Sequence, residues 1–432
     1  MWNMQKCNSS NLNYIATYHC KECNKIYESK VTRCDNPNCR AWNSIILGKP
    51  QEIGKIVKLS DIETGNIERL LCNDERLNEW DECLMGGTIP GLSYLLGGEP
   101  GIGKSTIALQ WLECMSKYGP TLYISGEEAG RHVNLRAQRL FSDNTIQFLE
   151  ERQIEKICEQ IKNTEPAFVV LDSAQILSIE GLRTGSIQCQ TESLSNIIET
   201  IKLLNTTLLI ISHVNKDGEI AGPKTLEHLV DVVLQFEGDR KQNLRILRAL
   251  KNRFGEQRMG IFHIKENGLI SVSGTDMLKI WDDNIPGRVA TIALEDGRTI
   301  ALEIQVMLGP PTNATPRRYS QGYPLNRLHM ILAVLEKNGI KLSNREVYVN
   351  VVGGIQVSDS GIDVGLARAL VDDTLDRPSD PSIVWIGEIG LKGEIIIPQA
   401  YDQRIRLASK MHLRCGLSMP NSIVNIIANR SG

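Results

Sequence analysis

Short apolar runs alternate with segments of helical periodicity in the middle of the chain. After the first of these runs, Ile107, Trp111 and Met115 recur at the spacing of one helix face. Strands separated by helix-length segments are typical of a parallel sheet with crossover helices. The pattern therefore predicts an α/β core over residues 46–272. The runs that predict its buried strands cover residues 92–96, 121–125, 167–173 and 207–212.

A second series of strand and helix patterns follows this core. Residues 288–294 and 299–307 flank Asp296-Gly297, a strong hairpin signal. Beyond a proline-containing connector, a helix is predicted over about residues 325–336, and the runs at 347–352 and 383–386 predict strands. The sequence therefore predicts a second α/β domain over residues 273–432.

Basic side chains are densest between the two series. Residues 244–250 alternate in character, which predicts a strand that projects the following turn from an edge of the sheet. Most basic runs are solvated faces, although such cations can also reach a neighbour's nucleotide or contact nucleic acid. The run consists of Arg240, Lys241, Arg245, Arg248, Lys251, Arg253 and Arg258.

The composition is that of a soluble protein of several domains. The chain has 432 residues, of which 41% are hydrophobic and 23% charged, and no apolar run approaches the roughly 18 residues of a membrane span. The opening MWNMQKC has no apolar signal core, so we predict a cytoplasmic protein with no membrane attachment. The formal net charge of -3 means that any nucleic-acid surface is a local patch.

Cysteine pairs mark residues 1–45 as a separate module. Cys20 and Cys23 form a C-x2-C pair, and Cys34 and Cys39 form a C-x4-C pair. Two such pairs suit tetrahedral Zn²⁺, and the surrounding sequence has too few apolar residues to fold without it. Scattered reduced thiols are the alternative. We predict a zinc-binding module that is mildly basic, which permits contact with nucleic acid.

A glycine-rich loop follows the first predicted strand and precedes the first predicted helix. It fits G-x-x-x-x-G-K-[ST], whose backbone N–H groups cradle phosphates at the positive end of a helix. We therefore predict ATP binding, with Lys104 on the β and γ phosphates and Ser105 on Mg²⁺. The predicted nucleotide-binding residues are Gly98, Glu99, Pro100, Gly101, Ile102, Gly103, Lys104, Ser105 and Thr106.

Carboxylates follow two of the other predicted strands. Glu127 and Glu128 come after residues 121–125, and Asp172 ends the next strand. Because the carboxyl ends of parallel strands line the ligand crevice, we predict that Glu127 activates the attacking water and that Asp172 supports Mg²⁺. The alternative for the two glutamates is that they cap the helix that begins near Ala129.

Polar groups at the same edge indicate contacts with other ligands. His213 follows the strand at 207–212, where it either senses the γ phosphate or plays a structural role. Two glycine-rich segments, 180–191 and 215–224, leave the sheet on the same side. Their cations Arg183, Lys216 and Lys224 suit contacts to single-stranded DNA, although ordinary solvated loops have the same composition.

These motifs resemble those of the bacterial RadA (Sms) DNA recombination and repair ATPases, which are related to RecA and to DnaB-type replicative helicases. The resemblance covers nearly the whole chain, and its most specific motif is Lys-Asn-Arg-Phe-Gly at residues 251–255. The other matching stretches are the cysteine finger ending in Trp42-Asn43, GGEPGIGKST, YISGEE, VVLDSAQ and ISHVNKDGEIAGPKTLEHLVD.

The resemblance implies a RecA-like core between a zinc finger and a domain similar to that of Lon proteases. By resemblance, Lys251 and Arg253 act in trans on ATP of the adjacent subunit in a homo-hexameric ring. Single-stranded DNA threads the channel of this ring. A RecA-type recombinase is the expected protein partner.

The Lon-like domain is predicted to lack peptidase activity. The match puts Gly361 at the position of the nucleophilic serine and Asp402 at the position of the lysine. Ser360 is adjacent, but a serine without its base is a weak nucleophile. The domain is expected to be a scaffold for oligomerisation and DNA binding.

Taken with the resemblance, the sequence predicts a DNA-dependent ATPase and helicase-like motor. It would move on single-stranded DNA to promote branch migration in homologous recombination and repair. The alternatives are a regulatory ring ATPase that switches protein partners and an ATP-dependent Lon-type protease. The sequence departs from the family pattern at the widened cysteine pair, at residues 357–360 and at His132.

Overall fold

The computed structural model divides the chain into two compact units, Met1–Ile67 and Glu68–Gly432. In the second unit it describes residues 68–141, 145–213, 225–238, 243–278, 285–312, 315–416 and 421–428. In the first unit it describes five short strands and residues 34, 36, 39 and 40.

The first unit contains two small antiparallel sheets. In one sheet, β1 pairs with β5, and in the other β2 pairs with both β3 and β4. Cys20 is the last residue of β2, and Cys34 is buried. The strands are β1 Tyr14–Ile15, β2 Tyr18–Cys20, β3 Ile26–Tyr27, β4 Ile45–Leu47 and β5 Gln51–Glu52.

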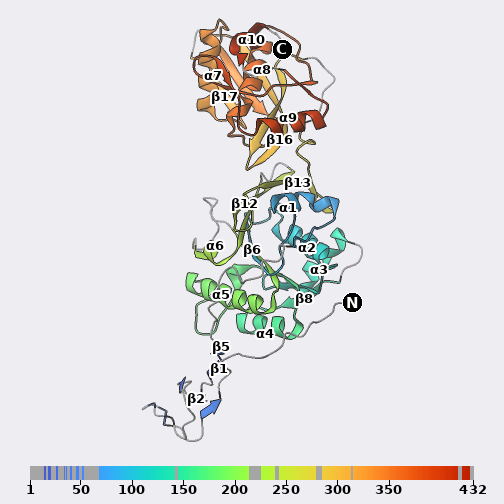
Figure 1. Cartoon of the computed structure of the whole chain (residues 1–432), viewed down its shortest axis with the longest axis vertical. Helices are drawn as coiled ribbons and strands as arrows, with labels where there is room; N and C mark the ends of the chain where they lie inside the picture. Colours follow the sequence, from blue (N-terminus) through green and yellow to red (C-terminus); the bar gives the residue numbers. More distant parts are fainter. Residues whose placement is uncertain are drawn as a thin grey trace. The chain divides into compact units, whose positions relative to one another are not determined.

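A nine-stranded sheet organises the first part of the second unit (Figure 1). Its order is β14-β13-β12-β11-β6-β10-β9-β7-β8. The strands from β11 to β8 run parallel, whereas β12, β13 and β14 pair antiparallel. The strands are β6 Ser93–Gly98, β7 Thr121–Ser125, β8 Gln147–Glu150, β9 Phe168–Asp172, β10 Thr207–Ile211, β11 Val232–Glu237, β12 Leu244–Asn252, β13 Met259–Lys265 and β14 Gly268–Ser271.

Helices cover both faces of this sheet because the strands are apolar on both sides. Tyr94 and Leu96 of β6 pack into the cluster that includes α1, α2 and α3, whereas Leu95 packs with α4, α5 and α6. Figure 1 shows these two sets of helices on opposite sides. The helices are α1 Asn78–Cys83, α2 Lys104–Met115, α3 Gly130–Leu140, α4 Ile154–Thr164, α5 Ile187–Leu204 and α6 Thr225–Leu229. Among the described residues, no helix has both the length and the apolar character needed to span a membrane.

The sequence predictions for this sheet were right about the main strands, and the structure differs from them in three details. The antiparallel β12, β13 and β14 make the sheet mixed rather than purely parallel, and β12 lies between two neighbours rather than at an edge. The predicted loop at 180–191 is helical from Ile187, where Ser186 accepts a hydrogen bond from the backbone N–H of Cys189 and so caps α5.

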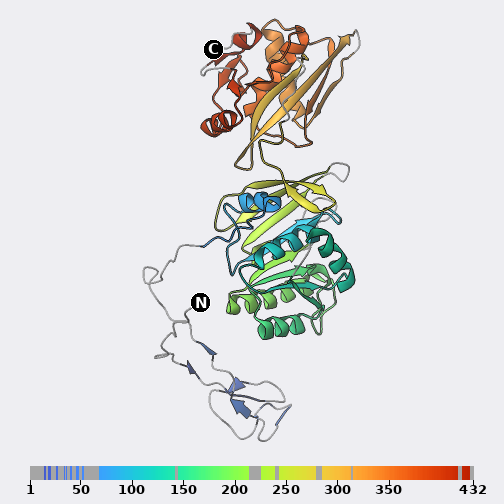
Figure 2. The same ribbon diagram turned by 90° about the vertical axis from the view of Figure 1, so that its right-hand side faces the viewer.

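A six-stranded mixed sheet organises the rest of the second unit, in the order β17-β18-β16-β15-β19-β22 (Figure 2). The predicted hairpin forms as β15 and β16, and the predicted helix as α7. Asp296, in the turn of the hairpin, has a positive φ of 42°. A small sheet has the order β20-β21-β23. The strands are β15 Arg288–Glu295, β16 Arg298–Pro311, β17 Arg318–Gln321, β18 Arg345–Val351, β19 Ile383–Val384, β20 Glu388–Ile389, β21 Glu394–Ile396, β22 Arg414–Cys415 and β23 Asn421–Ser422.

The helices of this second α/β part pack against its sheet through two apolar clusters. One includes buried residues of α7, α8 and α10, and the other includes Ala408 of α9 together with Ala290 and Ala301 of the long hairpin. The helices are α7 Leu325–Lys337, α8 Asp363–Thr374, α9 Tyr401–Lys410 and α10 Ile423–Ala428.

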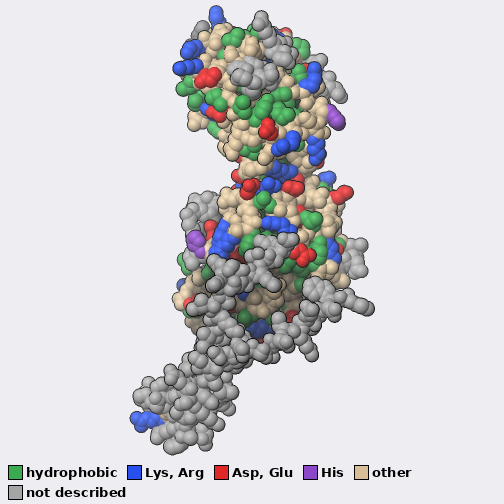
Figure 3. Space-filling model, viewed as in Figure 1, with side chains coloured by type: hydrophobic (Ala, Val, Ile, Leu, Met, Phe, Trp, Pro, Cys, Tyr) green, Lys and Arg blue, Asp and Glu red, His purple; other side chains and the backbone are tan. Residues whose placement is uncertain are grey.

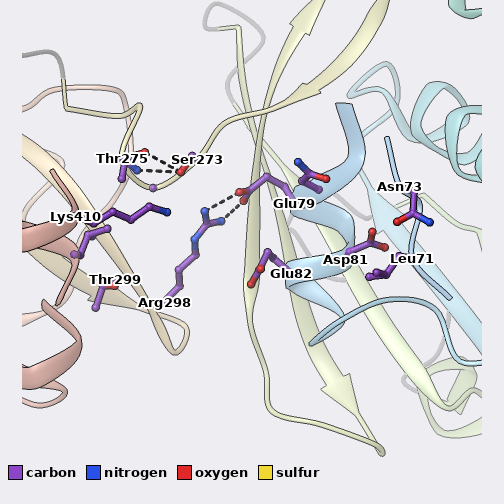
Figure 4. Close-up of a pocket in the computed structure, with 13 residues that line it drawn as sticks. Leu71, Asn73, Glu79, Asp81, Glu82, Ser273, Thr275, Arg298, Thr299 and Lys410 are labelled. Carbon is purple, nitrogen blue, oxygen red and sulfur yellow. Dashed lines mark hydrogen bonds and ion pairs between the residues drawn. The ribbon is translucent and has the colours of Figure 1, made fainter. Parts of the chain in front are cut away.

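The turn between β15 and β16 is tied to the nine-stranded part by ion pairs. Arg298 forms a salt bridge with Glu79 of α1, with Nη2 lying 2.7 Å from Oε1 (Figure 4). Asp296 in the same turn pairs with Arg248 of β12. The Arg298–Glu79 pair lines a cavity of about 540 Å³. Two charged contacts from one turn therefore join the two sheets of this unit.

Candidate active site

The phosphate loop has the backbone that its glycines allow. It joins Gly98, the last residue of β6, to Lys104, the first residue of α2. Gly101 and Gly103 have φ values of 78° and 118°, a left-handed region that side chains rarely adopt. The first backbone N–H groups of a helix, here those of Lys104 and Ser105, have no carbonyl one turn earlier to bond to, so this end of α2 suits a phosphate.

The Lys104 ammonium is folded back onto its own loop. Nζ donates to the carbonyl oxygens of Gly98 at 2.6 Å and Glu99 at 2.9 Å, and it lies 3.2 Å from Nδ1 of His213. Burial lowers the pKa of Lys104 to about 8, although the negative charges of Asp172 and Glu127 oppose this shift. No salt bridge joins Lys104 to a carboxylate in the part of the chain that the structure describes, and a phosphate would provide such an anionic partner.

Asp172 lies beside the start of α2, as the order of parallel strands predicts. It ends β9 and is 7% exposed, and burial raises the pKa of its carboxyl group. Hydrogen bonds from Tyr123 and Ser105 oppose that rise by stabilising the ionised form. A hydroxyl and a carboxylate in contact are the hard oxygen donors that Mg²⁺ prefers, so Ser105 and Asp172 fit this ion.

The two glutamates after β7 have different partners. Glu128 forms a salt bridge with Arg136 of α3, whose Nη2 lies 2.8 Å and 2.9 Å from its two carboxylate oxygens. Glu127 instead accepts a hydrogen bond from the Ser173 hydroxyl at 2.7 Å. Glu128 is therefore engaged in a local pair, whereas the carboxylate of Glu127 is held beside the end of β9.

His213 connects the phosphate loop to Glu127. Its Nε2 lies 3.7 Å from Oε1 of Glu127, while its Nδ1 faces the Lys104 ammonium at 3.2 Å. Because an ammonium can only donate, this contact is a hydrogen bond in the tautomer that carries no proton on Nδ1. The ring therefore joins a carboxylate that follows β7 to a cation that begins α2.

Sequence reasoning missed three side chains that support this site. Tyr123 donates its phenol proton to Asp172, and Ser173 orients Glu127. Arg245 of β12 is 4% exposed, and its Nε donates to the carbonyl oxygen of Ile102 at 3.1 Å. Tyr123 and Ser173 lie within or beside the predicted strands, but only the paired strands show what they contact.

Several side chains of the basic run have partners inside the molecule. Arg245 is buried against the phosphate loop, and Arg248 pairs with Glu237 at 3.0 Å as well as with Asp296. Figure 3 shows basic and acidic side chains interspersed at the level of β13. Arg240 and Lys241 lie outside the described residues. Internal partners therefore account for part of this charge.

Lys251 and Arg253 lie where the parallel strands of the sheet begin, whereas the phosphate loop lies where they end. Nζ of Lys251 donates to the carbonyl oxygens of Glu227 and Val230 at 2.7 Å and 2.8 Å, and Arg253 pairs with Asp231 at 3.2 Å. Asp231 also accepts from the backbone N–H of Ser93, the first residue of β6. The length of β6, roughly 16 Å, separates this level from the phosphate loop. The side chain of Arg253 is 52% exposed.

The remaining predicted site residues are only partly described. Arg183 is exposed in the segment between β9 and α5, whereas Lys216 and Lys224 lie outside the described residues. Cys34 is buried and Cys39 lies in a turn, whereas Cys23 is outside the described residues. Within the described part of the chain, no group of three or more His, Cys, Asp or Glu side chains could hold a metal ion.

A phosphate loop that opens the helix after a central parallel strand, with carboxylates at the carboxyl ends of other strands of the same parallel sheet, defines the class of P-loop ATPases. Residues 74–219 match the family model of the AAA domain. The DNA repair protein RadA of Streptococcus pyogenes serotype M6 is 35% identical over 416 residues, which cover 92% of this chain and 90% of that protein. RadA of Bacillus subtilis strain 168 is 35% identical over 415 residues, with 91% and 90% covered. The chain belongs to the RadA family of DNA repair proteins, which confirms the family predicted from its motifs.

A solved structure also matches part of the chain. The KaiC-like protein PH0186 of Pyrococcus horikoshii OT3 is 18% identical, with a TM-score of 0.40. The match covers 48% of this chain and all of that one.

Proposed function

We propose that this protein is a Mg²⁺-dependent, DNA-stimulated ATPase that assembles as a hexameric ring. It moves on single-stranded DNA and promotes branch migration during homologous recombination in the cytoplasm. The observation that carries the proposal is that the phosphate loop and the Lys251–Arg253 segment lie at opposite ends of the parallel strands. Each chain then offers a nucleotide site at one end of these strands and cations for a neighbour's site at the other.

The residues at the phosphate loop divide the chemistry among them. Lys104 and the loop N–H groups bind the β and γ phosphates of ATP. Ser105 and Asp172 would hold Mg²⁺, which neutralises phosphate charge when bound. Glu127 orients the attacking water and takes up its proton, and the Ser173 hydroxyl holds that carboxylate in place.

His213 acts as the sensor of the γ phosphate. Nδ1 of its ring lies 3.2 Å from the Lys104 ammonium, and Nε2 faces Glu127. When Lys104 turns to a phosphate, the ring loses its donor and is free to reorient. The segment that follows His213 contains Lys216, so this change supports coupling of ATP binding to contacts with DNA.

Lys251 and Arg253 complete the site of the adjacent subunit. Positive charge beside the γ phosphate stabilises the transition state of phosphoryl transfer. Arg253 is half exposed and has one surface ion pair to exchange, whereas Lys251 must leave two carbonyl oxygens. This difference supports Arg253 as the group that enters the neighbour's site more readily.

The other regions supply binding surfaces and assembly. Arg183, Lys216 and Lys224 contact the DNA backbone inside the ring. Cys20, Cys23, Cys34 and Cys39 bind Zn²⁺ in a module that contacts DNA or a RecA-type recombinase. The domain over residues 273–432 is a scaffold without peptidase activity, because Gly361 lies against Arg404 and has no nucleophilic group.

The test is ATP hydrolysis with and without single-stranded DNA over a series of salt concentrations. We expect DNA to stimulate turnover and rising salt to weaken the effect, because phosphate contacts release counterions. Lys104→Ala should abolish hydrolysis, whereas Arg183→Ala should reduce only the stimulation by DNA. If single-stranded DNA does not change the rate of ATP hydrolysis and salt does not change DNA binding, the result would favour the regulatory ATPase instead.

A further inference from the structure

Tyr123 is buried beneath the predicted metal-binding carboxylate. It is 1% exposed, and its phenol oxygen lies 2.5 Å from Oδ2 of Asp172. Ser125 pairs with Asp172 in the parallel ladder, and Tyr123 lies two residues earlier on the same face of β7. The Tyr123 side chain therefore extends along the sheet toward the carboxyl ends of the strands, where its hydroxyl meets the Asp172 carboxylate.

Packing fixes the ring in this position. Tyr123 stacks on Phe148 of β8, with ring centroids 6.4 Å apart and planes inclined by 16°. Side chains from α2 and α3 enclose the same space, which contains a cavity of only about 60 Å³ lined by Leu109, Val133 and Ala137 among others. Because the ring is held from several sides, its hydroxyl is a preorganised donor.

The carboxylate needs such a donor. Asp172 is only 7% exposed, so its oxygens depend on donors from the protein, and the Tyr123 hydroxyl donates to Oδ2 at 2.5 Å. Ser105 also donates to this carboxylate. Ser105 is itself one of the two groups that would bind Mg²⁺. Tyr123 is therefore the donor to this carboxylate that a metal ion need not displace.

We propose that Tyr123 is a positioning residue for the metal site, whose hydroxyl fixes the orientation of the Asp172 carboxylate. This inference rests on the proposed ATPase function. In this proposal the phenol makes no contact with ATP. Loss of the phenol hydroxyl should therefore raise the Mg²⁺ concentration needed to enhance nucleotide binding, and it should leave nucleotide binding without metal unchanged.

The test compares Tyr123→Phe with Tyr94→Phe. Tyr94 is 2% exposed, and its hydroxyl bonds to the backbone of Ile89, so this control removes the same atom from the same sheet away from the carboxylate. Binding of a fluorescent ATP analogue is measured in EDTA and then as Mg²⁺ is added. Thermal melting reports the stability of both variants.

We expect Tyr123→Phe to need about tenfold more Mg²⁺ for half-maximal enhancement of binding, as for the loss of one hydrogen bond to a charged group. Affinity in EDTA should match that of the parent, and Tyr94→Phe should keep the parental Mg²⁺ dependence. The proposal is overturned if the two variants show the same Mg²⁺ dependence, or if Tyr123→Phe loses affinity equally with and without the metal. Failure of the parent to bind ATP would instead overturn the proposed function.

Discussion

At the scale of single residues, Lys104 has two competing environments. Its burial in the phosphate loop lowers its pKa to about 8, although nearby carboxylates oppose this shift. A bound phosphate favours the ammonium form, so binding must raise that pKa. Above pH 8 the protein therefore has to take up a proton when it binds ATP.

We predict that affinity for ATP without metal falls about tenfold between pH 7 and pH 9. Lys104→Arg should bind more weakly but with a flatter pH profile, because a guanidinium stays protonated throughout this range. Titration calorimetry in buffers of different ionisation enthalpy measures the proton uptake directly. An unchanged affinity over this range would contradict the assignment.

The lowered pKa of Lys104 makes the stability of the fold rise with pH, whereas it makes the affinity for ATP fall with pH. Between pH 8 and 10.5 the unfolded chain holds a proton on Lys104 more often than the folded chain does. The contribution of this residue to the free energy of unfolding therefore rises with pH across that window.

At the scale of elements, Gly361 in the short helical turn before α8 leaves no room for a side chain. A Cβ atom there would lie 2.7 Å from Nη1 of Arg404. That guanidinium is fully buried and pairs with Asp359 at 2.7 Å and 3.0 Å, so it cannot swing away. The buried ion pair occupies the space beside Gly361, the residue that the sequence resemblance is predicted to align with the nucleophilic serine of Lon proteases.

Gly361→Ser should therefore destabilise the protein by about 1–3 kcal/mol without creating peptidase activity. Urea unfolding measures the change, and casein hydrolysis tests the activity. Ser360→Ala, a change at the adjacent residue that adds no atoms, should stay within about 0.5 kcal/mol of the parent. Equal stability of Gly361→Ser and the parent would show that Arg404 can yield.

The elements also show which parts of the structure the sequence can predict. The bounds of β7 agree with the predicted 121–125, because Pro120 and Gly126 end the apolar run on both sides. The Asp296-Gly297 signal likewise locates the long hairpin. Such features depend on neighbours in the chain, which a sequence displays directly.

Features that depend on distant contacts could not be predicted in this way. Glycines at 181 and 185 suggested one long loop, but the Ser186 cap starts α5 within it. In the sequence, Arg245 resembles any other surface cation. Its contact with Ile102 depends on the pairing of β12 with β11, which the sequence does not display. In the candidate site, the motif residues were therefore predictable and their supporting donors were not.

At the scale of the whole molecule, a shared site predicts complementation between inactive variants. Lys104→Ala disables the phosphate loop, and Arg253→Ala disables the Lys251–Arg253 segment at the opposite end of the strands. In a mixture of the two, an Arg253→Ala chain can bind ATP while its Lys104→Ala neighbour supplies the intact arginine. We expect each variant alone to be nearly inactive and an equimolar mixture to regain a measurable fraction of parental ATPase activity.

Activity is measured after the two proteins are mixed under conditions that let subunits exchange. Lys104→Ala mixed with the double variant Lys104→Ala/Arg253→Ala is the control, since this pair has no intact phosphate loop. Failure of the first mixture to exceed this control would contradict a site shared between chains.

If Arg253 completes a neighbour's site, as proposed, its position far from the phosphate loop also constrains the geometry of the assembly. An interface that joins one edge of a subunit to the other edge of the next is heterologous, so it extends as an open array or closes on itself. An open array always has one terminal nucleotide site without a donor and one terminal arginine without a site. Only a closed ring gives every chain a complete nucleotide site. Selection for activity at every site is therefore also selection for the rotation angle between subunits that closes the ring.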